Sequence, residues 1–542
     1  METIPPEIFI DICRHLCPHC YKPALQGQDL TEIAQNLFYG DAPEWLDLMK
    51  YSFLANHYKE RRCLQDSLAK LCRVSKSISR LATPILYHSL DESRGTVPGT
   101  LRFLETIGNN PELAACVRSF SPLLWNFHNH DTAMYDFFSA ARKSLGLREL
   151  DLDDDDDNAA ARALDGWIIG LALCAPNLEE MIINPDQMTP SYFDRQDEWK
   201  LLEEAPHHGL KSLKTLQLRH RSSRFYGRLG WDTTNKIFRA ATRLETLNIS
   251  NFGQVTALLP CLANLRQITI TESLFDESSF RNLIRNLPRI AEFKYHSGRL
   301  LHMAEAAEEI TGSELTRQLY TRRETLKRLD IDQSWASTPY PGGRRPFNSQ
   351  EVMRSLTDFP VLEYLRVNVV DVIPQTEPDV QSEDADDTGR PPRRNKAGEW
   401  FVGLAPPSLK TLKVMGHCPY DQCLRVSDGK RLGKCGASLE RVVFGDVKPS
   451  GHFFEPISTC DLALRKDIAW HFREEAGIPC EFAAEANRVA LYYMMPEEQR
   501  LPYIEIEEDE EEEYQPKWFK ELNARHSESD EEHEDIENEQ EG

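Results

Sequence analysis

Apolar residues recur along the central part of this 542-residue chain in one frame: an apolar residue, two others, an apolar residue, one other, and a third apolar residue. Ten copies occur, led by Leu147, Leu178, Leu213, Leu244, Leu265, Ile290, Leu326, Leu362, Leu409 and Leu439. In six of them all intervening positions are polar, whereas chance predicts about one such copy. Because alternate side chains of a strand point to opposite faces, the frame predicts short strands that share one core.

The gaps between these strands predict helices, so the fold class is α/β. Copies begin 21 to 47 residues apart, and the gaps hold helix-like stretches such as Thr234–Ala241 and Ser279–Leu287. This spacing is similar to that of leucine-rich repeats, whose strands line the concave face of a curved solenoid. Segments Leu210–Leu218 and Ser408–Val414 carry the resemblance best, and the missing asparagine of compact repeats indicates irregular repeats. An open α/β sheet is the alternative, without a phosphate-binding glycine loop to support it.

The amino terminus has a helical pattern instead. Residues 4–16 read Ile-Pro-Pro-Glu-Ile-Phe-Ile-Asp-Ile-Cys-Arg-His-Leu. The prolines can start a helix whose positive end Glu7 complements, and Ile8, Ile12 and Leu16 share one face. A second amphipathic helix is expected over residues 65–81, ended by Thr83-Pro84.

Three amino-terminal segments, Ile4–Ile8, Leu68–Lys76 and Leu81–Tyr87, together resemble an F-box of fungal proteins with leucine-rich repeats. Ile4 replaces the usual leucine, Ile78 replaces a common tryptophan, and an insertion at about 17–63, expected to be helical, splits the box. The resemblance implies a three-helix module that docks on the Skp-type adaptor of a cullin–RING ubiquitin ligase. The adaptor-binding residues that it implies are Pro5, Pro6, Glu7, Ile8, Ile12, Leu16, Leu68, Leu71, Val74 and Ile78. The alternative is a cap on the first core layer of the solenoid.

Charge separates the chain into a body and a tail. The formal net charge is −24, and residues 501–542 contribute 18 acidic and 3 basic side chains, which leaves −9 for residues 1–500. We therefore expect a module at 1–92, a repeat array at 93–500 and a disordered acidic tail at 501–542. An acidic chain does not favour nucleic acid or an anionic membrane as partner. Thirteen cysteines and no long apolar run favour a reduced, cytoplasmic or nuclear protein.

Two cysteine groups have spacings that resemble metal sites. Cys17-Pro18-His19-Cys20 has the Cys-x-x-Cys spacing, with Cys13 and His15 nearby, and a looser group comprises His417, Cys418, Cys423 and Cys435. A structural zinc site needs four ligands, and neither group supplies four at a recognised spacing. The prediction is therefore no metal and no cofactor, with a turn after Cys13 instead of a site.

Other segments that resemble catalytic or binding motifs lack essential residues. Residues 429–435 are one residue short of a phosphate-binding loop and end in cysteine, so a basic loop is expected. Asp153–Asp157 lacks the glycine and distal glutamate of a calcium loop. Residues 371–398 are long and polar and predict a disordered insertion, whose basic part resembles a nuclear import signal. No catalytic residue is expected.

The resulting hypothesis is a non-catalytic substrate-recognition subunit of a Skp–cullin–F-box ubiquitin ligase. Its target protein, which the sequence does not name, would contact polar positions of the strands: Lys214, Gln217, Glu245, Asn248, Arg266, Thr269, Lys327, Asp330, Lys410 and Lys413. Two alternatives stay open. One is a repeat scaffold that joins no ligase because the insertion blocks docking, and the other is an enzyme that uses a metal bound by the cysteines.

Overall fold

The computed structural model describes residues 5–17, 19–20, 63–90, 97–121, 175–183, 209–219, 237–250, 262–273, 275–297, 310–333, 352–372, 404–431, 438–448 and 459–482. The chain divides into two units, Met1–Asn487 and Arg488–Gly542, and all described residues belong to the first. The frame led by Leu147, the acidic run Asp153–Asp157 and the tail from residue 501 lie outside the described residues. So do residues 21–62 of the insertion expected at 17–63.

Three helical segments form the amino-terminal part: α1 (Pro6–His15), residues 63–71 and α4 (Lys76–Leu86). A proline occupies the first position of α1, where its missing N–H leaves no bond unmade. These segments pack around a small apolar cluster of Cys13, Cys17, Leu68, Ala82 and Ile85, all buried.

The expectation of one helix over residues 65–81 is wrong. Residues 72–74 form a turn, and Ser75 begins α4 as an extended N-cap whose side chain accepts a hydrogen bond from the Ile78 N–H at 3.2 Å. Serine caps compete with helix continuation in this way. Pro84 does not end α4 either, because Tyr87 N–H still donates to the Thr83 carbonyl at 3.2 Å.

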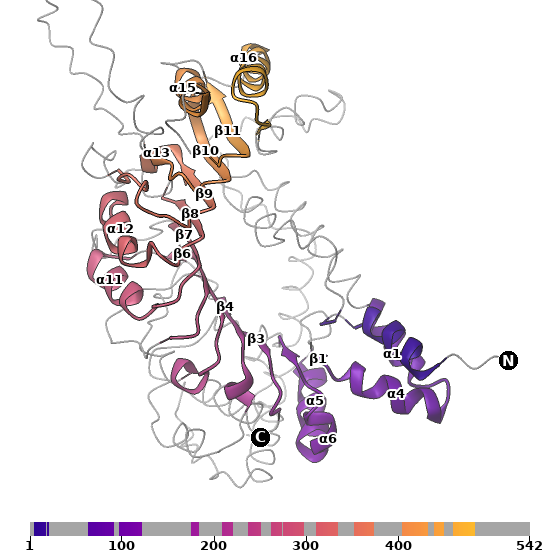
Figure 1. The fold of residues 1–542 in the computed structure, drawn as a ribbon. Coiled ribbons are helices and arrows are strands. Elements are labelled where there is room, and N and C mark those ends of the chain that lie inside the picture. The colour runs from indigo at the N-terminus through magenta and orange to yellow at the C-terminus, as the bar shows by residue number, and fades with distance from the viewer. Residues whose placement is uncertain are drawn as a thin grey trace, which may run out of the picture. The chain divides into compact units, whose positions relative to one another are not determined.

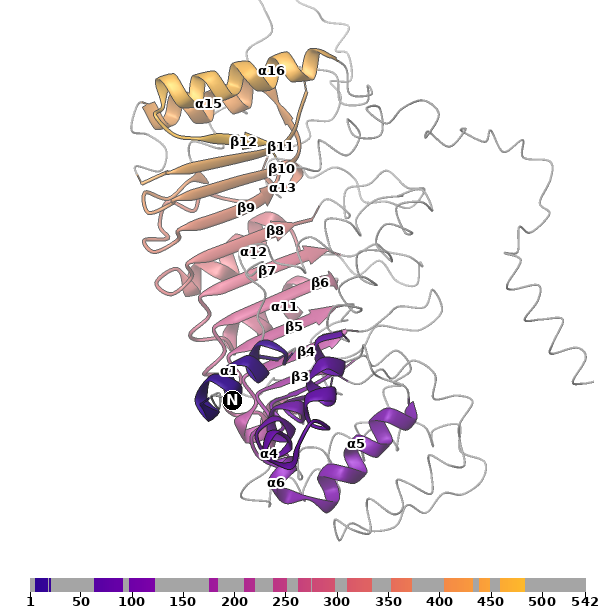
Figure 2. The same ribbon diagram turned by 90° about the vertical axis from the view of Figure 1, so that its right-hand side faces the viewer.

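Within the described residues, one parallel sheet of twelve strands follows chain order (Figure 2). The strands are β1 (Ser89–Leu90), β2 (Ser119–Phe120), β3 (Glu180–Ile183), β4 (Thr215–Arg219), β5 (Thr246–Ser250), β6 (Gln267–Ser273), β7 (Glu292–Ser297), β8 (Arg328–Asp332), β9 (Tyr364–Asn368), β10 (Thr411–Pro419), β11 (Arg441–Lys448) and β12 (Cys480–Phe482). Each neighbouring pair is parallel.

Nine of the ten predicted frames coincide with β3 to β11, which confirms the strand reading for the described residues. The frame led by Leu147 lies outside the described residues, and among those residues β2 pairs directly with β3. Strands β1, β2 and β12 were missed. They are short, and the frames that they complete begin at Tyr87, Val117 and Gly477 instead of the leucine or isoleucine that leads the ten predicted frames.

Helices follow several of the strands. They are α5 (Val97–Asn109), α6 (Pro111–Ala114), η5 (Gly209–Ser212), α11 (Glu277–Arg285), α12 (Gly312–Leu319), η6 (Tyr320–Arg322), α13 (Val369–Val372), α15 (Tyr420–Arg431), α16 (Thr459–Trp470) and η9 (His471–Glu475). The expected helix at Ser279–Leu287 is α11, which starts earlier because Asp276 caps it. Residues 371–372 of the predicted insertion belong to α13, and residues 429–431 of the predicted basic loop complete α15.

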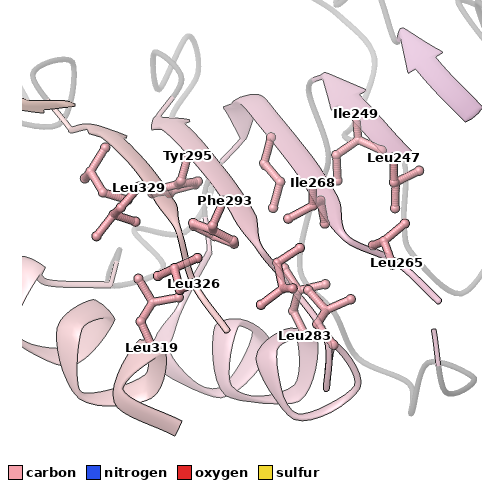
Figure 3. Packing of buried hydrophobic residues seen from close by; sticks show 14 of the residues in the cluster. Leu247, Ile249, Leu265, Ile268, Leu283, Phe293, Tyr295, Leu319, Leu326 and Leu329 are labelled. Atoms are coloured by element: carbon pink, nitrogen blue, oxygen red, sulfur yellow. The ribbon is translucent and has the colours of Figure 1, made fainter. Parts of the chain in front are cut away.

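Helices α11 and α12 cover one face of the sheet at β6 to β8 (Figure 1). Side chains at equivalent positions of neighbouring strands stack toward them: Leu247, Ile268, Phe293 and Leu329 are in register and buried. Figure 3 shows these side chains packed with Leu283 of α11 and Leu319 of α12. The core cluster extends from Leu90 to Ile478, so consecutive strand–helix units share one core.

A repeated backbone bond fixes where each strand begins. The carbonyl of the residue before a strand accepts N–H bonds from two residues of the next unit, as Lys214 does from Glu245 (2.8 Å) and Thr246 (2.9 Å). The same pair of bonds recurs from Arg118 to Lys410 and holds successive strands in register. Across the described ranges, no helix has the length and apolar content to cross a membrane.

Candidate functional site

Three large apolar side chains of the amino-terminal helices face solvent. Ile8 and Ile12, one turn apart on α1, are 53% and 43% exposed, and Val74, in the turn before α4, is 64% exposed. The opposite side of α1 carries Cys13, which is fully buried. An amphipathic helix that buries one face and leaves isoleucines on the other offers an apolar surface for a partner.

The ten residues predicted to bind an adaptor divide by burial. Pro5, Pro6, Glu7, Ile8, Ile12 and Val74 are exposed, whereas Leu16, Leu71 and Ile78 are half-buried. Leu68 is fully buried in the cluster between the helices, so its place on a contact surface was wrong. Its side chain points inward because residues 63–71 use that position to pack on α1 and α4. We call Pro5, Pro6, Ile8, Ile12 and Val74 the apolar surface.

The ten polar residues predicted to bind a target fall into two rows. Five directly precede strands and form an exposed strand-entry row: Lys214, Glu245, Arg266, Lys327 and Lys410. The other five lie in register on the outward face of the sheet, and with Lys294 and Arg366 between them they form what we call the outward row: Gln217, Asn248, Thr269, Asp330 and Lys413. The sequence predicted that all ten residues lie on one face of the sheet. The structure instead places five along the edge where the strands begin and five on the outward face.

Arg118, Glu179 and Glu363 also directly precede strands and extend the strand-entry row, and residues of opposite charge along it form ion pairs. Glu179 lies 3.4 Å from Arg118 and 3.0 Å from Lys214, and Lys410 lies 3.2 Å from Glu363. Burial alone would raise the pKa of Glu179, but the hydrogen bond and charge of Lys214 lower it. Such exposed pairs contribute below about 1 kcal/mol each, so the lysines can exchange partners at little cost.

Strands β7, β8 and β9 carry a buried charged cluster that includes members of the outward row. It comprises Lys294, His296, Asp330, Asp332 and Arg366, and we call it the Asp330 cluster. Arg366 Nη1 donates to Asp330 Oδ1 at 2.9 Å, and His296 Nε2 lies 2.8 Å from the same oxygen. Lys294 Nζ lies 3.9 Å from Asp330 Oδ2, and Arg366 Nη2 lies 3.9 Å from Asp332 Oδ2. The side chains of His296 and Arg366 are both 4% exposed.

Opposite charges determine the protonation state of this cluster. Burial alone would raise the pKa of Asp330, yet Arg366, His296 and Lys294 hold it well below its usual range. Burial, together with the charges of Arg366 and Lys294, lowers the pKa of His296 against the opposing effect of Asp330. The cluster is thus an ionised aspartate held by an arginine beside a neutral histidine. It is a structural ion network that includes members of the outward row.

Sequence reasoning selected Asp330 but missed its partners. Arg366 is the register partner of Asp330 in the next strand. In the preceding strand the register partner of Asp330 is Lys294, and His296 lies two residues after it. The signal was available, because the register position of Asp330 holds Gln217, Asn248 and Thr269 in β4 to β6 and changes to charged residues in β7 to β9.

A second cluster brings together side chains that are distant in sequence. Ligand atoms of Cys17, His19, Cys20 and His88 all lie within 4.8 Å of one another. Cys20 Sγ lies 3.7 Å from His19 Nδ1 and 3.4 Å from His88 Nδ1. The hydrogen bond with Cys17 lowers the pKa of Cys20 and raises that of Cys17; His19 and His88 lower the pKa of Cys20 further against burial.

The other cysteine group is not assembled in the same way. Cys423 belongs to α15 and is fully buried in the apolar core, while His417 and Cys418 belong to β10. Cys435 lies outside the described residues. The structure therefore provides one Cys–His cluster among the described residues, and His88 is the member that the sequence did not indicate.

No family model matches this chain, and no curated protein matches it. Function therefore has to be inferred from the sequence and from the surfaces described above.

Proposed function

We propose that this protein is a substrate-recognition subunit of a Skp–cullin–F-box type ubiquitin ligase. The amino-terminal helices would act as the F-box and bind the Skp-type adaptor, and the strand–helix units would act as an irregular leucine-rich-repeat solenoid that binds a target protein. The chain itself would carry no catalytic residue, because the ligase's other subunits supply the chemistry.

The observation that carries this proposal is the apolar surface. Ile8 and Val74 belong to the segments whose sequence resembles an F-box, Ile12 lies one turn after Ile8 on α1, and all three are substantially exposed. Burying a fully exposed large aliphatic side chain contributes about 1.5–3 kcal/mol, and these three are about half exposed, so together they can anchor a helical partner. A simple cap on the first core layer would bury its isoleucines against that layer instead of leaving them in solvent.

The parallel sheet supports the second half of the proposal. Strand–helix units in chain order with a buried stripe on one face and polar side chains on the other are what a leucine-rich repeat requires. The outward row and the strand-entry row would provide the target surface. Their mixed charges favour a protein surface with both signs of charge over a strongly basic target.

Copurification tests the proposal directly. The tagged full chain, expressed in fungal cells, should retain the Skp-type adaptor and a cullin, both identified by mass spectrometry. Ile8→Asp combined with Val74→Asp places two charges in the apolar surface and should remove both partners. Tyr320→Asp makes the same kind of change at a residue of η6 that is 42% exposed, and it should keep them.

Two results would argue against the proposal. If the wild-type chain fails to retain the adaptor while a known F-box protein in the same lysate does so, the scaffold alternative is favoured. If the double variant retains the adaptor as well as the wild type does, the apolar surface is not the docking site. Far-UV circular dichroism of both variants checks that they are folded.

A further inference from the structure

The Cys–His cluster lies where α1 meets the first strand of the sheet. Cys17, His19 and Cys20 follow directly after α1, whereas His88 directly precedes β1, 68 residues beyond Cys20. Their ligand atoms all lie within 4.8 Å of one another. Side chains from two distant segments therefore converge on one point, which a local turn after α1 does not require.

The distances match those around a tetrahedral metal ion. With metal–sulfur bonds of about 2.3 Å and metal–nitrogen bonds of about 2.0–2.1 Å, neighbouring sulfur and nitrogen ligands lie about 3.6 Å apart. Cys20 Sγ is 3.4 Å from His88 Nδ1 and 3.7 Å from His19 Nδ1. The two imidazole rings are nearly perpendicular, at 89° with centroids 6.0 Å apart, so both can direct a nitrogen to a common centre.

The donor set selects the metal. Two thiolates and two imidazoles are the ligands of structural zinc sites, whereas calcium and magnesium require oxygen ligands, and the cluster contains no carboxylate. A redox-active Cys-x-x-Cys pair is the main rival, since it needs the two thiols alone. Convergence of both histidines on the thiols favours a closed four-ligand site.

We propose that Cys17, His19, Cys20 and His88 bind one zinc ion that fastens α1 to the start of the sheet. Within the part of the chain that the structure describes, the apolar cluster that holds α1 contains five buried residues, and such a small core gains much from a metal. The His88 end is already fixed, because its carbonyl accepts N–H bonds from Arg118 (2.8 Å) and Ser119 (2.9 Å) of the next unit. Gln65 Nε2 also donates to the Ser89 carbonyl at 3.0 Å.

Metal analysis of the purified full chain tests this site independently of any ligase. The wild-type chain, produced with added zinc and purified without chelators, should contain one zinc ion per molecule by plasma mass spectrometry. Cobalt substitution should give visible ligand-field bands and a thiolate charge-transfer band. Cys20→Ser and His88→Ala should lose the metal, while Cys63→Ser, at an exposed cysteine outside the cluster, should keep it.

Alkylation of the wild type locates the site even if those variants do not fold. Cys17 and Cys20 should resist alkylation until a chelator is added, whereas Cys63 should react in both conditions. Absence of zinc and of the cobalt bands would overturn the proposal, as would full metal retention in both folded variants. An intact mass that shows a Cys17–Cys20 disulfide in the metal-free chain would assign the pair to redox chemistry instead.

Discussion

Arg366→Leu is the most informative perturbation of the sheet, because it removes the main positive partner of a buried aspartate. Arg366 is 4% exposed and donates to Asp330 Oδ1 at 2.9 Å. Without it, Asp330 keeps His296 at 2.8 Å and the more distant Lys294 at 3.9 Å. The substitution should therefore leave a buried negative charge that is poorly compensated.

The expected loss follows from that burial. Removing one partner of a buried ion pair costs about 3–5 kcal/mol, whereas replacing both partners by apolar residues is often close to neutral. Arg366→Leu should thus destabilise the fold by about that amount, and Arg366→Leu with Asp330→Leu should recover most of it. Arg328→Leu is the matched control: this arginine of β8 is 53% exposed, lies 3.7 Å from Glu292, and should cost below about 1 kcal/mol.

Urea unfolding followed by tryptophan fluorescence and circular dichroism measures these differences. Equal losses for Arg366→Leu and Arg328→Leu would refute the view that burial makes the Asp330 cluster sensitive. A double variant no more stable than Arg366→Leu alone would refute the assignment of the loss to an uncompensated Asp330.

The loss should also depend on pH. In the wild type the pKa of His296 is lowered, so below the unfolded value of about 6.5 the unfolded chain binds a proton that the folded chain does not, and stability falls. Arg366→Leu removes one cause of this lowering, so the folded variant can bind that proton beside Asp330. The stability difference between variant and wild type should therefore be smaller at pH 6 than at pH 8, and an unchanged difference would contradict this assignment.

Four further substitutions test the core, a helix cap, an irregularity within strand β10 and a helical glycine by the same urea assay. Phe293→Ala, at a fully buried ring of β7, should cost about 3–5 kcal/mol. Thr311→Ala removes the capping box of α12 and should cost about 1 kcal/mol. Gly416→Ala should destabilise by more than about 1 kcal/mol, since φ is +80° and the added carbon would meet Asn368 Oδ1 at 2.6 Å. Gly108→Ala, in α5 with open space around it, should instead be neutral or stabilising.

The strands could be predicted because burial imposes a rigid period on them. Each unit from Leu178 to Leu439 places its apolar residues in the same frame, since all of them must face one shared core. The apolar period is weaker in the strands at the two ends of the sheet. The unit that contains β12 has Gly477 where interior units have leucine or isoleucine, and Cys480 pairs in register with Val442 of β11, so too little periodicity is left to recognise.

The sites were less predictable because they combine residues from separate segments. Cys17 and Cys20 were visible as a pair, but His88 lies beyond an insertion and reaches them only through the fold. Leu68 was assigned to a surface because a helical stripe does not reveal which of its residues faces the partner and which faces the neighbouring helices. The apolar pattern predicts where helices and strands lie, whereas the face that each one exposes depends on how it packs against its neighbours.

Direct titration of the purified full chain with a purified Skp-type adaptor tests the central claim most closely. The account predicts a one-to-one complex, and at least a hundredfold weaker binding for Ile8→Asp with Val74→Asp, which corresponds to about 2.8 kcal/mol at 1.4 kcal/mol per tenfold change. The Tyr320→Asp chain should bind as the wild type does. A wild-type chain that is folded and does not bind the adaptor at micromolar concentrations would contradict the claim.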